Sequence, residues 1–228
     1  MRLKSSALRR ILVSAGFCLL VGATAVQAST LTINDLSFEG PSPDNGAYGY
    51  QPTIGVPVPL MTFPGLYSGW TFAGGSGVTR ASSAFNPPSA PFPDGSQAAF
   101  LQGVGASVTQ SIGGFSGTET YMVQFSVGSR YSNGSYDGNA TLGVSIDGTE
   151  IGQIVLTSST PWFTYSSPSF TAATGAHSLS IYNLSSGDHT GFVDAVSITG
   201  TAAAVPEPST ILLAGAGLLS LGLLRRRR

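Results

Sequence analysis

The sequence has almost no cysteine and very few cations in its middle part. Cys18 is the one cysteine among 228 residues, so a disulfide framework cannot form. Eight of the ten Lys and Arg residues lie in the first ten or last four positions, which leaves Arg80 and Arg130 to face ten acidic residues in between. Phosphate neutralisation needs clustered Lys and Arg, so we expect no nucleic-acid partner. An acidic surface of this kind suits a soluble domain that meets cations or neutral polar polymers.

Catalytic signals are also scarce. The two histidines, His177 and His189, do not have the spacing of a metal-binding pair. The segment 114–118 (GFSGT) ends in Thr where a nucleophile elbow needs Gly, and no helix follows it. A glycosidase needs two carboxylates at a set separation, and nothing in the sequence brings Glu119 and Glu150 together. We therefore expect the protein not to be an enzyme.

Residues 1–28 have the three parts of a secretory signal peptide. A positive region is followed by the apolar stretch 11–21 and by the small-residue site 26–28, with cleavage expected before Ser29. The positive residues are Arg2, Lys4, Arg9 and Arg10. Cys18 follows Phe17 and not a small residue, which argues against a lipoprotein signal. The mature chain would then contain no cysteine.

The C-terminal end reads VPEPSTILLAGAGLLSLGLLRRRR. Its uncharged apolar run, 209–224, is expected to form a transmembrane helix, because in lipid a backbone must satisfy its own hydrogen bonds. At about 1.5 Å per residue the run spans roughly 24 Å, which is short of a hydrocarbon core of about 30 Å. A terminal run of four arginines can reach the interface and hold the C-terminus in the cytoplasm. These are Arg225, Arg226, Arg227 and Arg228.

This tail resembles the PEP-CTERM sorting signal, which some catalogues call the C-terminal domain of ice-binding proteins. The match comprises the four motif residues, the apolar run and the terminal arginines, in that order. The motif residues are Val205, Pro206, Glu207 and Pro208, within a linker at 201–208. The resemblance implies a Gram-negative exported protein that is held in the inner membrane. An exosortase-type membrane protease would cut it near the motif, and the product would reach the cell surface or the extracellular space. The alternative is a plain C-terminal membrane anchor.

The middle part, 29–200, is rich in Gly, Ser, Thr and Pro and lacks helical periodicity. Short apolar or alternating runs recur roughly every ten residues between turn signals, which is typical of an all-β sandwich in one domain. Strands are expected at 31–39, 69–72, 77–80, 97–102, 106–112, 120–128, 140–146, 150–156, 162–171, 177–183 and 192–199. The proline-rich stretches 40–65 and 86–94 are expected to be irregular loops. Asp147-Gly148 is the clearest hairpin signal.

Seven segments of this domain resemble, in order, the galactose-binding-like jelly rolls, a fold that includes carbohydrate-binding modules. The segments are 34–39 (NDLSFE), 69–70 (GW), 93–101 (PDGSQAAFL), 108–112 (VTQSI), 121–126 with Arg130, 162–165 (WFTY) leading to Phe170, and 192–198 (FVDAVSI). The likeness covers nearly the whole domain and depends on the order of the segments. It implies an all-β jelly-roll sandwich.

A structural calcium often joins the first and last strands in relatives of that fold. The matching carboxylates here are Glu39 in Ser-Phe-Glu and Asp194 in Val-Asp-Ala-Val. Calcium binds carboxylate and carbonyl oxygens, so the resemblance implies Ca²⁺ at these two residues, with Asp35 as a further candidate. The alternative is that Glu39 lies at the edge of a loop and that Asp194 only accepts hydrogen bonds in a turn.

Aromatic residues in the loops are the candidates for a sugar-binding platform. The four loop tyrosines are Tyr48, Tyr50, Tyr131 and Tyr136. Trp162 starts a strand and could stack on a sugar or belong to the core, whereas Trp70 is expected in the core. Arg130 offers a planar fork of donors for sugar hydroxyls or a carboxylate, or forms a salt bridge with a nearby acid.

These observations together indicate an exported surface or matrix protein that binds extracellular polysaccharide without catalysis. One alternative is a structural adhesin or matrix protein with no specific ligand, which would not need an exposed aromatic cluster. Another is an enzyme that acts on extracellular polysaccharide, which would need convergent carboxylates in a cleft. Ice binding would need a flat, regularly spaced Thr-rich face, and the sequence shows no such repeat.

Overall fold

The structure is a computed structural model of the chain. It describes residues 28–40, 48–50, 69–81, 83–89, 91–132 and 136–202, and in the tail residues 215–218, 220, 222 and 225. Residues 26–203 form one compact unit, and residues 1–25 with 204–228 form a second. The thirteen strands that the structure describes all belong to the first unit.

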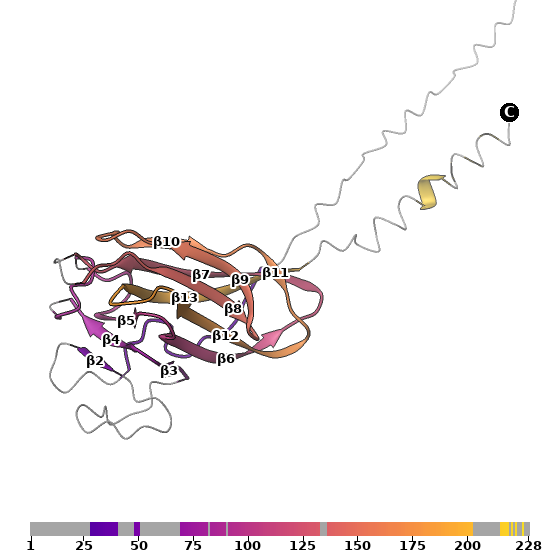
Figure 1. The fold of residues 1–228 in the computed structure, drawn as a ribbon. Coiled ribbons are helices and arrows are strands. Elements are labelled where there is room, and N and C mark those ends of the chain that lie inside the picture. The colour runs from indigo at the N-terminus through magenta and orange to yellow at the C-terminus, as the bar shows by residue number, and fades with distance from the viewer. Residues whose placement is uncertain are drawn as a thin grey trace, which may run out of the picture. The chain divides into compact units, whose positions relative to one another are not determined.

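Two antiparallel sheets face each other in the first unit (Figure 1). The larger sheet has the order β10 (Phe163–Ser166), β7 (Glu119–Ser129), β13 (Thr190–Ala202), β5 (Gln97–Gln102), β4 (Ser76–Arg80) and β2 (Tyr48–Tyr50), with β1 (Ala28–Thr30) beside β13 and β11 (Phe170–Thr171) beside β7. The smaller sheet has the order β3 (Thr71–Ala73), β6 (Ser107–Phe115), β12 (Gly175–Asn183), β8 (Thr141–Ile146) and β9 (Thr149–Val155). The unit is an all-β sandwich, as the sequence predicts.

One hydrophobic core fills the space between the sheets. On β7, every second side chain from Tyr121 to Val127 is at most 1% exposed, because successive residues of a strand point to opposite faces. These side chains share a buried cluster with Leu179 and Ile181 of β12 in the smaller sheet. Burial of one such side chain stabilises the fold by about 1.5–3 kcal/mol.

The turn between β8 and β9 confirms the predicted hairpin. Asp147 has φ of 50° and Gly148 has φ of 77°. Positive φ at both central residues is the pattern of a type I′ turn, whose twist matches that of the two strands.

The strand predicted at 31–39 is wrong, because residues 34–37 form a turn. Asp35 and Phe38 have φ of 48° and 58°, which are left-handed values that a strand does not adopt. Phe38 is fully buried, and its ring centroid lies 5.0 Å from that of Trp70. The Trp70 indole Nε1 donates a hydrogen bond of 2.9 Å to the Asp35 carbonyl. Packing on Trp70, which is in the core as predicted, therefore outweighs the alternating pattern.

Two further strand predictions need correction. The stretch 40–65, expected to be irregular, contains the short strand β2 at its residues 48–50. The strand expected at 162–171 is divided into β10 and β11 by residues 167–169. Pro168 has no N–H to donate to the sheet, and the Ser167 hydroxyl instead accepts a hydrogen bond of 3.1 Å from the Val123 N–H.

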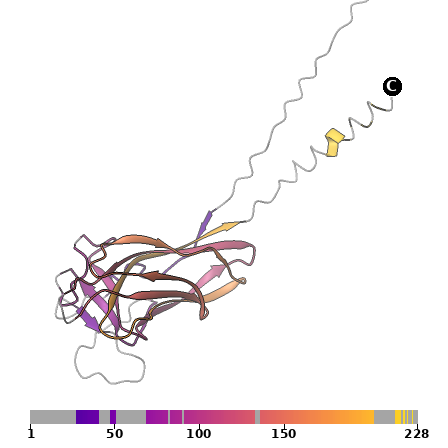
Figure 2. The ribbon, with the colours of Figure 1, turned by 45° about the horizontal axis from the view of Figure 1, so that its top comes forward.

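The two ends of the first unit lie side by side (Figure 2). β1 pairs with the last residues of β13, with Ala28 opposite Thr201. The first residue of β13, Thr190, pairs with Gln102 at the other end of the sandwich. A thirteen-residue strand is roughly 40 Å long, so the loops before β13 lie far from the point where the chain leaves the domain.

The predicted export segments lie mostly outside the described residues. This holds for residues 1–27 of the signal peptide, for the motif 205–208 and for 226–228. Within the predicted membrane helix, residues 215–218, 220 and 222 are helical, as is Arg225. No helix among the described residues has the length and apolar character needed to cross a bilayer.

Candidate functional site

Aromatic side chains gather on the outer face of the larger sheet. Leu101 of β5 points into the main core, so the alternation of the strand sends Phe100 to the opposite face. Phe192 of β13 lies directly across from Phe100, and both rings are fully buried. Phe85, from the loop between β4 and β5, stacks on Phe100 with ring centroids 4.0 Å apart. Tyr48 packs edge-on against Phe85, with centroids 5.0 Å apart.

Arg130, which directly follows β7, is held between aromatic rings beside this cluster. Its guanidinium carbon lies 3.5 Å from the ring centre of Tyr136 and 5.0 Å from that of Phe85. Nη1 donates a 3.0 Å hydrogen bond to Asp188 Oδ1, and Nη2 donates one of 2.8 Å to the Ala84 carbonyl. A desolvated cation–π contact of this kind contributes about 2 kcal/mol. Arg130 thus forms the salt bridge that the sequence left open, and its position is fixed.

A chain of hydrogen bonds connects Arg130 to Tyr50 on β2. The Tyr50 hydroxyl donates to Gln102 Oε1, and Gln102 Nε2 donates to the Asp188 oxygen that also accepts from Arg130. Burial raises the pKa of Tyr50, and the negative charge of Asp188 raises it further, so the phenol stays protonated as a donor. Tyr50 is nevertheless 40% exposed, and its ring lies edge-on to Phe100.

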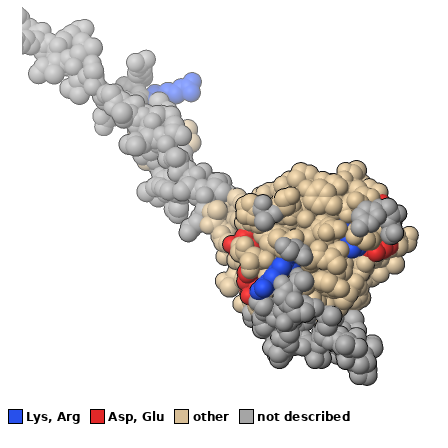
Figure 3. All heavy atoms as spheres, turned by 90° about the vertical axis from the view of Figure 1, so that its left-hand side faces the viewer, with Lys and Arg blue, Asp and Glu red and all other residues tan. Residues whose placement is uncertain are grey.

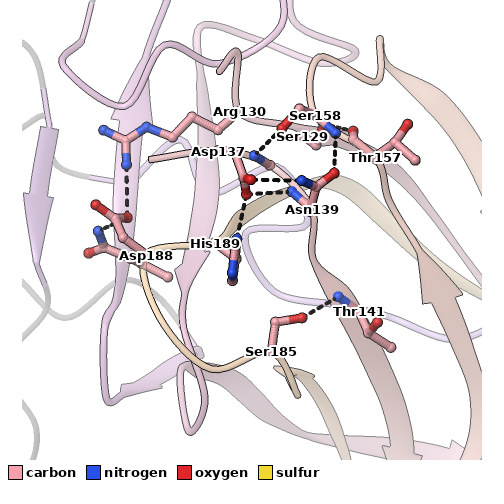
Figure 4. A network of polar contacts seen from close by, with 12 residues as sticks. Ser129, Arg130, Asp137, Asn139, Thr141, Thr157, Ser158, Ser185, Asp188 and His189 are labelled. Carbon is pink, nitrogen blue, oxygen red and sulfur yellow. Dashed lines mark hydrogen bonds and ion pairs between the residues drawn. The ribbon is translucent and has the colours of Figure 1, made fainter. Parts of the chain in front are cut away.

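A second polar group adjoins this chain in the same loops (Figure 4). His189, next to Asp188, hydrogen-bonds through Nδ1 to Asp137 Oδ1. Asn139 donates its backbone N–H to Asp137 Oδ1 at 2.9 Å and its side-chain Nδ2 to Oδ2 at 2.7 Å. Burial works to raise the pKa of Asp137, but the hydrogen bonds from Asn139 and His189 outweigh it and lower the pKa. Asp137 is therefore an ionised carboxylate.

We call Tyr50, Gln102, Arg130, Tyr136 and Asp188 the Arg130 site. Its outward groups are accessible, because the Asp188 side chain is 42% exposed. Figure 3 shows this end of the sandwich, where a largely uncharged surface has two small groups of charged atoms, each with acidic and basic atoms side by side. A fixed cation, an exposed ring and exposed acceptors can bind a ligand that has both apolar faces and hydroxyls.

The structure brings four predicted ligand-binding residues together. Tyr48, Tyr50, Arg130 and Tyr136 all contact one another or Phe85. Tyr131 follows Arg130 and is 40% exposed. Trp162 is partly buried, and its ring packs against Phe92 and Phe192, so it belongs to the aromatic cluster.

Sequence reasoning did not find three members of this assembly. Phe85 and Gln102 appear in the sequence as ordinary loop and strand residues, and only the fold places them beside Arg130. Asp188 is one of ten acidic residues between the two ends of the sequence, and only the structure shows that its carboxylate accepts from both Arg130 and Gln102. No local signal in the sequence links residues so far apart in the chain.

The two predicted calcium ligands, Glu39 and Asp194, both accept hydrogen bonds from the segment 94–97 at the start of β5. Glu39 accepts three hydrogen bonds from the residues just before and at the start of β5. The donors are Ser96 N at 2.7 Å, Ser96 Oγ at 3.0 Å and Gln97 N at 2.6 Å. Asp35 instead accepts from Glu39 N at 2.8 Å and from Gly40 N at 3.3 Å, which closes its own turn.

Asp194 is fully buried on β13 beside a carboxylate that was not predicted. Its Oδ2 accepts a 3.0 Å hydrogen bond from Asp94 N, and its Oδ1 accepts one of 2.7 Å from Ala195 N. Burial is the main reason that the pKa of Asp194 rises to about 7, and the nearby charges of Asp94 and Glu39 add to it. Gln97 Oε1, buried in the same region, has no hydrogen-bond partner among the described residues.

These oxygen atoms are of the type that binds calcium, although they are not arranged as a preformed coordination site. Three carboxylates and one unpartnered amide oxygen are the hard oxygen ligands that Ca²⁺ binds. Within the described ranges, however, no three His, Cys, Asp or Glu side chains converge closely enough to hold a metal. The carboxylate oxygens of Glu39 and Asp194 are turned toward N–H donors, so binding would require small side-chain movements.

The fold is an all-β sandwich of two antiparallel sheets, and the tail carries a sorting motif. Residues 204–228 match the PEP-CTERM protein-sorting motif, so the chain carries this motif at its C-terminus. The match confirms the resemblance seen in the sequence and indicates an exported protein. Comparison with curated proteins gives no match to this chain.

Solved structures with a similar fold include an enzyme and sugar-binding modules. A Stig cyclase, Fisc from Fischerella sp. TAU, is 16% identical with a TM-score of 0.55, covering 78% of this chain and 100% of its own. TmCBM61 in complex with β-1,4-galactotriose is 16% identical with a TM-score of 0.47, covering 75% and 98%. Carbohydrate-binding module CBM36 in complex with calcium and xylotriose is 21% identical with a TM-score of 0.37, covering 58% and 98%. At 16% identity the likeness to the cyclase concerns the fold alone, and the TM-scores of the two modules are too low to establish a common fold.

Proposed function

We propose that this is an exported cell-surface or extracellular-matrix protein that binds a polysaccharide, without catalysis, at the Arg130 site. The observation that carries the proposal is the guanidinium of Arg130, fixed between the Tyr136 ring and the half-exposed carboxylate of Asp188. This site joins residues from the larger sheet and from two loops into one surface at the end of the sandwich.

Sugar recognition explains why these residue types occur together. The apolar face of a pyranose packs on an aromatic ring, and the exposed Tyr50 and Tyr131 offer such rings. Sugar hydroxyls can donate to the Asp188 carboxylate and to the phenol oxygen of Tyr50, and they can accept from the second N–H of the Gln102 amide. A charged acceptor such as Asp188 makes the stronger hydrogen bonds. The ring beneath Arg130 keeps this polar array in place before a ligand arrives.

The sorting motif supports the extracellular location. PEP-CTERM sorting implies transit through the inner membrane of a Gram-negative cell and recognition by an exosortase-type protease. The apolar run 209–224 serves as the temporary membrane anchor in this proposal, and residues 205–208 are the recognition strip. Release of the folded domain then leaves it at the cell surface or in the extracellular matrix.

Calcium has a structural part in this proposal. Glu39, Asp94 and Asp194, with the amide oxygen of Gln97, would hold the ion. When bound, the ion supplies positive charge that favours the ionised form of the buried Asp194 carboxylate. Hydrogen bonds already connect Glu39 to the start of β5, and Asp94, just before β5, to Asp194 on β13.

The test is retention of the full chain, in a detergent without a sugar head group, on immobilised xylan, galactan, dextran and alginate. We expect Tyr136→Ala and Tyr50→Ala to lower the affinity for the retained polymer by about tenfold or more. Phe163→Ala is the matched control, because Phe163 is a 41% exposed aromatic residue of the edge strand β10. Unchanged retention in both tyrosine variants would remove the Arg130 site as the binding surface. A wild-type protein that binds no polymer would favour a structural matrix protein.

A further inference from the structure

The outer face of the smaller sheet carries an aromatic ring near the end of its central strand, β12. Tyr182 of β12 lies directly opposite Gly143 of β8 in the register. A Cβ atom on Gly143 would come within 2.5 Å of two ring atoms of Tyr182, so the ring lies across the glycine backbone. Tyr182 is only partly buried, which leaves the rest of the ring open to solvent. The ring is therefore supported from below and accessible from outside.

A β-bulge places two polar side chains beside this ring. Gln153 pairs with Gly143 and Glu150 pairs with Ser145, and the register shifts between these pairs. Residues three apart on a regular strand point to opposite faces, but one extra residue, Ile151, turns Glu150 and Gln153 to the same face. Bulges of this kind often re-aim side chains next to functional sites.

Tyr182, Glu150 and Gln153 form one hydrogen-bonded group. The Tyr182 hydroxyl donates to Glu150 Oε2 at 3.1 Å, and Gln153 Nε2 donates to both oxygens of Glu150 at 3.0 Å. Burial raises the pKa of Tyr182, and the hydrogen bond to Glu150 raises it further, so the phenol stays a donor. The exposed Glu150 carboxylate keeps lone pairs for further donors, and the Gln153 carbonyl is a second acceptor.

Much of the rest of this face carries small hydroxyl side chains, and Val155 of β9 is an exposed apolar residue at its edge. A row of four crosses neighbouring strands in register: Thr71, Thr109, Ser180 and Ser145. Thr109 Oγ1 donates to Ser180 Oγ at 3.0 Å within that row. Both cations of residues 26–203 lie elsewhere, Arg80 on β4 and Arg130 after β7. The face therefore lacks the apolar core of a protein interface and the charge needed for an anionic polymer.

We propose that this face is a second carbohydrate-binding surface, where a neutral pyranose stacks on Tyr182 and donates hydroxyls to Glu150 and Gln153. The carbohydrate ligand of this second surface rests on the proposed function, but the surface lies on the other sheet. With two such surfaces, one domain can bind a single polymer at both sites or two polymers at once. Binding of one polymer at both sites raises the overall affinity. Tyr182 also shields Gly143, and a purely structural role would affect stability alone.

The experiment compares Tyr182→Ala, Tyr182→Phe and Glu150→Gln with wild type, each as the full chain in a detergent without a sugar head group. Retention is measured on xylan, galactan, dextran and alginate, and each variant's melting temperature is recorded. Tyr182→Phe keeps the ring and tests whether loss of the hydroxyl alone matters. We expect Tyr182→Ala to weaken retention on a neutral polymer about tenfold, Glu150→Gln to weaken it severalfold, and Tyr182→Phe to stay near wild type.

A Tyr136→Ala background separates this surface from the Arg130 site. Residual retention that disappears when Tyr182→Ala is added supports the second surface, whether or not the Arg130 site binds. Retention that Tyr136→Ala removes while Tyr182→Ala leaves it unchanged overturns the inference and keeps the proposed function. Wild-type binding to none of the neutral polymers also overturns it. If Tyr182→Ala melts before the assay temperature, Glu150→Gln decides, and wild-type affinity in that variant counts against the inference.

Discussion

Arg130 and Asp188 form an ion pair whose partners differ sharply in exposure. Nη1 and Oδ1 are 3.0 Å apart, yet the Arg130 side chain is 6% exposed and the Asp188 side chain 42%. The cation therefore serves the fold, held by rings and by the Ala84 carbonyl, while the anion faces outward. This difference supports the binding proposal, because the buried Arg130 guanidinium orients the exposed Asp188 carboxylate toward a ligand.

Removal of the Asp188 carboxylate should cost stability. Asp188→Ala leaves the buried Arg130 guanidinium without its anion, and a fully buried pair would lose about 3–5 kcal/mol. Solvent screening at the exposed Asp188 reduces this to about 1 kcal/mol. Urea denaturation measures the difference, with Asp188→Asn as the control that keeps an oxygen acceptor. An Asp188→Ala protein as stable as wild type would show that the pair adds nothing to the fold.

Gly143→Ala should destabilise the smaller sheet. The new Cβ would press on the Tyr182 ring at 2.5 Å, and overpacking of this kind costs about 1–3 kcal/mol. Gly113→Ala on β6 is the matched control, because nothing lies within 4 Å of its added Cβ and its φ is not positive. Thermal melting of both variants measures the contrast. Equal melting temperatures would mean that the Tyr182 ring moves aside freely.

Stability should depend on pH through His177 and Asp147. Nδ1 of His177 lies 2.5 Å from Asp147 Oδ2, and its Nε2 lies 2.9 Å from the Ala173 carbonyl, so both nitrogens face acceptors. The hydrogen bond to Asp147 raises the pKa of His177, and the same bond lowers the pKa of Asp147.

The sign of this dependence follows from the two shifts. The contribution of His177 is complete below its usual pKa of about 6.5 and is lost as pH rises through the higher folded value. The contribution of Asp147 is present above about 3.9 and is lost as pH falls through the lower folded value. The pair should therefore stabilise most between about pH 4 and 6.5. Denaturation of wild type and His177→Ala across pH measures this, and parallel curves would refute it.

Calcium should raise the melting temperature through Asp194 and Glu39. We expect a rise of several degrees for wild type in calcium over chelator, because the ion would offset the burial of the Asp194 charge. Asp194→Asn and Glu39→Gln should lose this difference. Asp188→Asn, which removes a charge outside the group, should keep it. A wild-type protein with the same melting temperature in calcium and chelator would exclude a structural ion.

Processing should depend on the motif in the tail. In cells with an active exosortase, the wild-type protein should lose the residues after the motif, and intact-mass measurement should show this. Glu207→Ala should accumulate in the membrane at the length left by signal-peptide removal. Arg80→Ala, outside the tail, is the control for export. A wild-type protein that keeps its tail in such cells would favour a plain membrane anchor.

The sequence predicts the strands well where apolar and polar residues alternate clearly. It fails where the packing of a distant buried aromatic residue determines the backbone conformation. β7 and the turn at Asp147-Gly148 follow from local patterns, because pleat and turn geometry act over a few residues. The turn at 34–37 does not, because Phe38 adopts a left-handed conformation only to reach Trp70, more than thirty positions away.

The candidate site was predictable by residue type but not by partner. Loop tyrosines and a rare Arg130 stand out in the sequence, and the structure brings most of them together. Their acceptors, Gln102 and Asp188, belong to types found everywhere in the chain, so only the register of β5 with β13 reveals them. The same holds for Tyr182 and Glu150, which a single bulge places side by side.

The run of β13 from the Arg130 end to the tail determines how the domain would bear force. In the proposed function, a polymer bound at the Arg130 site before the tail is cut would pull along the axis of this strand. β13 is hydrogen-bonded to β5 and β7, and those bonds lie perpendicular to the strand. The pull therefore loads many bonds at once in shear instead of opening them one at a time. In the proposed function, the longest of the described strands would therefore carry the load between the binding site and the tail.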